Sequence, residues 1–191
     1  PPKRCPQTGA GRKKMIMNIQ IKIEETEQSI KLYAPYSPSN NRDYKSRGGK
    51  WDKDSSVWEF PKTEATQKML AELFGAPSEI VTAKLEYADI EAIDNLWQCG
   101  GYVVASRSGR DYPVRIADGV QVTKGQFRYS CGSVKNPKVG DSSDGLEFSL
   151  VCYRSFAESK KLEIVSVDSS FNPLAAFSDA QLLAEIKRRG L

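Results

Sequence analysis

The sequence contains no histidine among its 191 residues. This absence excludes Ser-His-Asp and Cys-His triads, two-histidine metal sites and histidine proton shuttles. A GxxxxGK[ST] phosphate loop is also absent, so no motor of that class is encoded here. The four cysteines, at positions 5, 99, 131 and 152, form no CxxC pair, and a zinc site is therefore not expected. Cys152 lies in an apolar run and is interpreted as a small core residue.

Long apolar runs are missing as well. No stretch approaches the ~20 residues needed to span a bilayer, and the first twenty residues lack the apolar block of a secretion signal. We therefore expect no membrane partner, a cytoplasmic location and free thiols. We also expect no cofactor, because no dinucleotide fingerprint or metal-ligand pattern is present.

The chain has 28 basic and 24 acidic residues, a net charge of +4. Residues 1–20 contain five of the basic residues and no acidic one, so the remainder is close to neutral. Residues 1–15 are interpreted as a basic tail, either vector-derived or a native arm for the phosphate backbone. The local distribution of charge is therefore more informative than its total.

The first part of the chain predicts a β-hairpin and a helix. Residues 16–23 alternate apolar and polar side chains, which indicates a strand, and residues 29–33 are its expected hairpin partner. Residues 36–41 are expected to break regular structure, and Gly48-Gly49 to form a turn. A short strand over 57–60 and a helix over 62–74 follow, with a boundary at 76–78.

The second part predicts mostly strands, expected over 80–87, 102–106, 113–116, 120–124, 145–154 and 161–167. A tight hairpin turn is expected at Asp118-Gly119, a helix or loop over 88–95, and a polar turn over 156–161. Ser178 and Gln181 form a capping box that opens a last helix. The fold class is therefore α+β: a basic tail over 1–15, a hairpin-helix module over 16–76, a mostly antiparallel β domain or small barrel over 78–168, and a C-terminal helix over 177–191.

The most distinctive motif runs from Gly48 to Pro61. Trp51 and Trp58 flank a polar turn that contains Asp52, Asp54 and Ser55. Short polar side chains of this kind bond to their own backbone and shape tight turns. We expect the two tryptophans to face each other across a hairpin, with Trp58 and Phe60 in the core. Trp51 is either a core residue or a surface for stacking.

This motif resembles the HARP-type module of annealing helicases over residues 29–75, with matching residues at Trp51, Asp52, Asp54, Ser55, Trp58 and Phe60. In that family the module accompanies a helicase motor and engages branched DNA or junctions of single- and double-stranded DNA. Because this chain has no motor phosphate loop, the resemblance implies DNA binding without ATP-driven work.

Two basic stretches with interleaved aromatic residues point in the same direction. Residues 42–53 hold five basic and two acidic residues, and residues 102–138 hold seven basic and two acidic ones. Basic side chains neutralise phosphates, and aromatic faces stack on unpaired bases. The expected DNA contacts in the first stretch are Arg42, Lys45, Arg47, Lys50, Trp51 and Lys53. Those in the second stretch are Arg107 and Arg110, on an expected mobile basic loop over 106–112, and Arg115.

The sequence thus predicts a non-catalytic protein that binds single-stranded or junction DNA, with RNA as an open possibility. We expect an accessory factor of a phage or plasmid, acting in replication or recombination. One alternative is a protein-binding adaptor or inhibitor that uses the two tryptophans and the acidic stretch 86–94. Another is a magnesium-dependent nuclease built on Glu147 and Glu158-Ser-Lys160. A homodimer through an unpaired sheet edge is also open.

Overall fold

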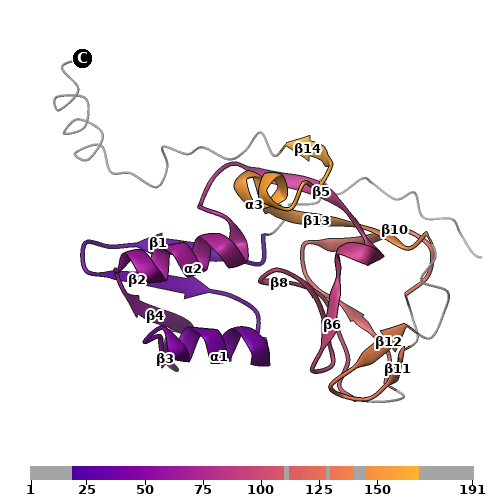
Figure 1. Cartoon of the computed structure of the whole chain (residues 1–191), viewed down its shortest axis with the longest axis horizontal. Helices are drawn as coiled ribbons and strands as arrows, with labels where there is room; N and C mark the ends of the chain where they lie inside the picture. Colours follow the sequence, from indigo (N-terminus) through magenta and orange to yellow (C-terminus); the bar gives the residue numbers. More distant parts are fainter. Residues whose placement is uncertain (1–18, 110–111, 128–129, 140–144, 168–191) are drawn as a thin grey trace, which may run out of the picture.

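We describe the fold from a computed structural model, which defines residues 19–109, 112–127, 130–139 and 145–167. The chain has the expected α+β fold, with an N-terminal unit of one sheet and two helices and a second unit made mostly of antiparallel strands (Figure 1). The expected basic tail and the expected helix over 177–191 lie outside the described residues. So do residues 16–18 of the first expected strand.

The N-terminal sheet is antiparallel with the order β1-β2-β4-β3. Its strands are β1 (Lys22–Glu25), β2 (Ser29–Tyr33), β3 (Lys50–Asp52) and β4 (Val57–Pro61). The β1–β2 hairpin confirms the expected pairing, but the bounds expected for the first strand were wrong, since residues 19–21 lie outside a strand and β1 continues to Glu25. Ile30 and Leu32 alternate along β2 and are fully buried, so one face of the sheet belongs to the core.

Two helices complete this unit. Helix α2 (Glu64–Phe74) confirms the expected helix, since Thr63 caps its first turn and Gly75 ends it. Helix α1 (Pro38–Ser46) lies where a break was expected, and that expectation was wrong. Ser37 is its N-cap and Pro38 its first residue, so the same Ser and Pro that indicate a break also start a helix. The buried ring of Tyr44 then holds α1 against β4, at 5.3 Å from the ring of Trp58.

The second unit contains two four-stranded sheets and a small hairpin. One sheet has the order β10-β13-β5-β14, with β5 (Ile80–Glu86), β10 (Val120–Lys124), β13 (Glu147–Tyr153) and β14 (Ile164–Val167). The other has the order β6-β7-β8-β9, with β6 (Glu91–Ile93), β7 (Leu96–Cys99), β8 (Tyr102–Ser106) and β9 (Arg115–Ile116). The hairpin joins β11 (Ser130–Gly132) to β12 (Pro137–Val139). A short 3₁₀ helix, η1 (Tyr87–Asp89), precedes β6.

Three local expectations in this unit were wrong. The segment 88–95 was expected to form a helix or loop, but it contains strand β6. Asp118-Gly119 does form a turn, but β9 before it pairs with β8, whereas β10 after it pairs with β13. The turn therefore moves the chain from one sheet to the other and closes no hairpin. Residues expected to form a polar turn instead form helix α3 (Arg154–Ser159). Burial of the Phe156 side chain explains this, since that ring is fully enclosed.

The two units share one continuous hydrophobic core. The amide of Gly101 donates to the carbonyl of Leu73 at 2.8 Å, and the hydroxyl of Tyr102 donates to the carbonyl of Phe74 at 3.2 Å. A Cβ on Gly101 would overlap the ring of Phe74. The glycine therefore allows β8 to approach the end of α2 closely.

Cys152 is fully buried in β13, which confirms its interpretation as a core residue, and Cys99, Cys131 and Cys152 are free thiols. None of the helices within the described ranges is both long enough and apolar enough to cross a membrane.

The close approach at Gly101 generates a prediction about the stability of the junction between the two units. Gly101→Ala should lower the free energy of unfolding by about 1–3 kcal/mol, because the added methyl group overpacks the contact with Phe74. Urea denaturation followed by tryptophan fluorescence measures this. Gly109→Ala is the matched control, since its Cβ would meet Tyr112 only at an ordinary 3.5 Å. Equal midpoints for both variants would contradict the tight approach at Gly101.

Candidate nucleic-acid interface

A groove lies between helix α1 and the β3–β4 hairpin. Its volume is about 370 Å³, and it is lined by Ala34, Pro35, Tyr36, Asn41, Lys45, Trp51 and Trp58. The ring of Tyr36 is 74% exposed and that of Trp51 is 45% exposed. Two aromatic side chains and one lysine are thus presented to solvent around a single hollow, which we call the aromatic groove.

The hairpin fixes the position of Trp51. Trp51 is the register partner of Trp58, and their ring centroids are 5.5 Å apart, as expected from the motif. Trp58 is buried and packs on Tyr44, while Phe60 is also buried, which confirms both as core residues. The groove therefore has a packed base in Trp58 and a half-exposed wall in Trp51.

The turn after Trp51 is organised by the carboxylate of Asp52. This carboxylate accepts a hydrogen bond from the hydroxyl of Ser55 and another, at 3.0 Å, from the amide of Asp54. These bonds, that of Ser55 first, lower the pKa of Asp52 below its usual value. The polar residues of the motif thus shape the turn, as expected, and hold β3 beside β4.

The fold places the basic residues of 42–53 on different surfaces of the N-terminal unit. Lys45 lines the groove, and Arg47 and Lys53 are exposed beyond α1 and β3. Lys50 is also exposed, but it is adjacent to Trp51 in a strand, so its side chain points to the opposite face of the sheet. Within the described part of the chain, none of these four side chains makes an ion pair. The structure therefore brings Lys45 together with Trp51 and separates Lys50 from both.

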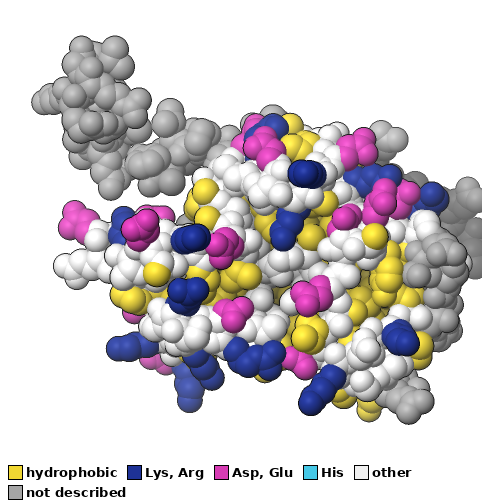
Figure 2. Space-filling model, viewed as in Figure 1, with side chains coloured by type: hydrophobic (Ala, Val, Ile, Leu, Met, Phe, Trp, Pro, Cys, Tyr) yellow, Lys and Arg dark blue, Asp and Glu magenta, His cyan; other side chains and the backbone are white. Residues whose placement is uncertain are grey.

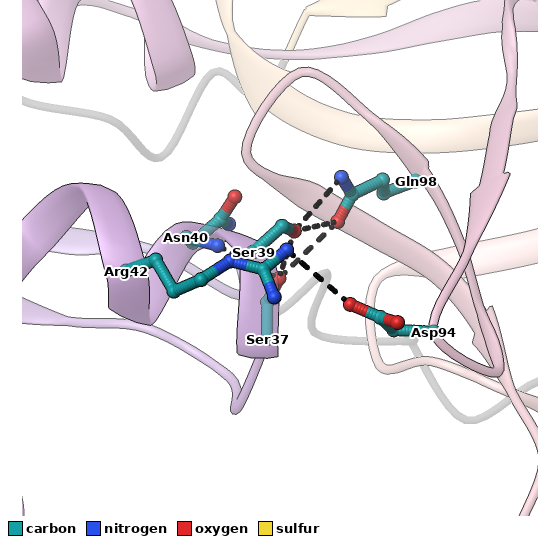
Figure 3. Close-up of polar contacts among 6 residues, drawn as sticks. All are labelled: Ser37, Ser39, Asn40, Arg42, Asp94 and Gln98. Atoms are coloured by element: carbon teal, nitrogen blue, oxygen red, sulfur yellow. Dashed lines mark hydrogen bonds and ion pairs between the residues drawn. The ribbon is translucent and has the colours of Figure 1, made fainter. Parts of the chain in front are cut away.

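Arg42 has a different environment. Its guanidinium lies 3.4 Å from the carboxylate of Asp94, on the turn between β6 and β7 (Figure 3). The Arg42 side chain nevertheless remains 68% exposed, so it is both a link between the two units and an accessible cation.

Arg107 is not a surface contact, which corrects its expected place on a mobile basic loop. The residue is 5% exposed, and its guanidinium lies over the ring of Trp97. It donates five hydrogen bonds, to the side chains of Asn95 and Ser130 and to the carbonyls of Cys131, Gly132 and Ser133. All the donors of an arginine side chain are thereby used. Arg107 fastens the β11–β12 hairpin to the sheet below it.

Of the other two residues expected in the stretch 102–138, the structure describes only Arg115. Arg115 is exposed on β9, the edge strand of its sheet, and does not line the aromatic groove. Arg110 lies outside the described residues.

Five of the acidic side chains that carried the alternative hypotheses have partners in the fold. Glu86 and Asp89 form a capping box around η1, and Asp94 pairs with Arg42. Glu147 pairs with Lys84 and Lys124, which lowers its pKa, and Glu158 lies near Arg154. No group of three acidic, cysteine or histidine side chains suited to a metal ion occurs in the described part of the chain.

The clamp formed by Arg107 can be tested directly. Arg107→Lys keeps the charge but loses the planar fork, and should destabilise the hairpin by about 1–3 kcal/mol because buried carbonyls lose their donors. Hydrogen exchange of the amides in β11 and β12 should accelerate, while amides in β2 and β4 remain protected. Arg115→Lys, on an exposed edge, is the control and should leave all four strands unchanged. Unchanged protection of the hairpin in Arg107→Lys would show that the clamp is unimportant.

No family model, no curated protein and no solved structure matches the chain.

Proposed function

We propose that this protein binds single-stranded or junction DNA in the cytoplasm without catalysing a reaction. The observation that carries the proposal is the aromatic groove, in which Tyr36 and Trp51 are exposed beside Lys45. The resemblance of residues 29–75 to HARP-type modules supports the same function. An accessory role for a phage or plasmid fits a DNA-binding chain that has no motor phosphate loop.

The groove suits an unpaired base. An aromatic face stacks on any base, and each such contact contributes about 1–3 kcal/mol. The groove volume of about 370 Å³ is within the range of small-molecule pockets, so it is large enough to receive one base beside the exposed aromatic side chains. Lys45 then lies where it can neutralise a flanking phosphate.

The same features favour unpaired over duplex DNA. In a duplex the faces of the bases are stacked on one another and are not available to Trp51 or Tyr36. Proteins that read a duplex place a helix or a ribbon in a groove of the DNA, whereas here the aromatic residues surround a hollow. We therefore propose single strands, and the unpaired arms of junctions, as the substrate.

The proposal predicts specific losses of affinity. Trp51→Ala should weaken binding of a single-stranded oligonucleotide about 5- to 150-fold, which corresponds to the loss of one stacked base. Lys45→Ala should reduce the slope of log affinity against log salt by about 0.7, the value for one phosphate contact on a single strand. Fluorescence anisotropy measures both, with blunt duplex and forked DNA compared in parallel.

Lys50→Ala is the matched control for Lys45→Ala. It removes the same charge from the same N-terminal unit, but from β3 and from the face of the sheet opposite Trp51. It should change the salt slope less than Lys45→Ala does. If neither single-stranded nor forked DNA binds at low salt, the proposed function is wrong. If only RNA of equal length binds, the DNA assignment is wrong.

A further inference from the structure

We propose that a bound single strand continues beyond the aromatic groove, along α1 and across to the β11–β12 hairpin, where Lys135 and Lys138 contact its phosphates. This inference rests on the proposed function and extends it. The two basic stretches lie about fifty residues or more apart in the sequence, but the fold places parts of both along one edge. Figure 2 shows Lys and Arg side chains following this lower edge, and Figure 1 shows α1 and the hairpin on the same side with β6 between them.

The first step of this path follows α1. Lys45 lines the groove, and Arg42 precedes it by three residues, so the two side chains are neighbours on one side of the helix. The rise between them is about 4.5 Å along the helix axis. A strand that leaves the groove at Lys45 therefore meets Arg42 next.

The second step crosses from one unit to the other, and its geometry is fixed. The side chain of Gln98 on β7 accepts hydrogen bonds from Ser37 at 3.3 Å and Ser39 at 3.4 Å (Figure 3). Asn40 donates to the carbonyl of Gly101 at 3.2 Å. These contacts hold the start of α1 against the second unit, and the 3.4 Å pair of Arg42 and Asp94 lies on the same seam.

The third step reaches the hairpin. The amide of Asn95, the residue after Asp94, donates to the carbonyl of Val134 at 2.8 Å. Arg107 bonds to Asn95 and to three carbonyls of residues 131–133, so the hairpin cannot move independently of that turn. The Asp94-Asn95 turn thus contacts both Arg42 and Val134, the residue before Lys135.

The exposed part of the hairpin suits a phosphate backbone. Lys135 and Lys138 are exposed, and neither makes an ion pair with any residue that the structure describes. The hairpin presents no exposed aromatic ring among its described residues, only Val134 as a large exposed apolar side chain. This half of the path therefore contacts phosphates without stacking, and binding there is independent of base sequence.

The test compares oligo-dT of about four nucleotides with oligo-dT of about sixteen, the range covered by small single-strand-binding domains. The full chain should bind the longer strand more tightly. The double substitution Lys135→Ala/Lys138→Ala should remove most of that advantage. It should also reduce the salt slope for the longer strand by about 1.4, or 0.7 for each phosphate that is no longer neutralised. Affinity for the short strand should be unchanged.

The control is Lys68→Ala/Lys160→Ala, which removes two exposed lysines from α2 and the end of α3, elements away from the lower edge. It should leave the advantage of the longer strand intact. If both double variants lose the affinity advantage of the longer strand equally, the proposed path is wrong. The proposed role of the aromatic groove would still stand, because the short strand would still bind and its binding would still depend on Trp51. Failure of both strands to bind would overturn the proposed function together with the path.

Discussion

The side chain of Tyr102 joins the two units of the molecule. Its hydroxyl donates to the carbonyl of Phe74 at the end of α2 and accepts from the amide of Tyr153 at 3.2 Å. Its ring packs edge-on against Phe74 and at a tilt against Phe156, where the ring centroids are 4.7 Å apart. Burial raises the pKa of Tyr102 above its ordinary value, so the hydroxyl keeps its proton and continues to donate. The start of α1 contacts Gln98 on β7 and Gly101, the residue before Tyr102, so the start of α1 and the Tyr102 junction use the same β7–β8 hairpin.

Sequence patterns were most reliable where one side of an element is apolar and its ends carry clear signals. The β1–β2 hairpin, the Trp51–Trp58 pairing and α2 all have these features, and all were confirmed. Helix α1 was missed because its residues are Ser, Asn and charged side chains, with Tyr44 as its main buried apolar contact. Packing of the Tyr44 ring on β4 stabilises a helix that the local sequence alone does not predict. Strands β6, β7, β11 and β12 are three or four residues long, too short to show a period.

The sequence predicts less of the candidate site than of the fold. Composition identifies a basic, aromatic stretch, but it does not say on which face of a strand each residue lies. Alternation in β3 puts Trp51 with Lys45 and turns Lys50 away, a division that becomes clear once the strand is known. Arg107 could not be assigned from sequence, because its partners are backbone carbonyls some 24 to 26 residues away. Tyr36 was not among the expected contacts, although it is the most exposed large apolar side chain described.

The modest charge of the molecule is consistent with a mode of binding in which stacking contributes more than electrostatics. Each phosphate contact adds affinity to any nucleic acid, whereas a stacked base adds affinity only when that base is unpaired. A surface with many unopposed lysines would therefore bind duplex and single strands alike. On the proposed path, the cation at the midpoint, Arg42, is partly neutralised by Asp94. In the proposed mode of binding, this pairing would lower the non-selective part of the binding energy, and the choice of substrate would depend on Trp51 and Tyr36. A surface of this kind would select for exposed bases because stacking requires an unpaired base.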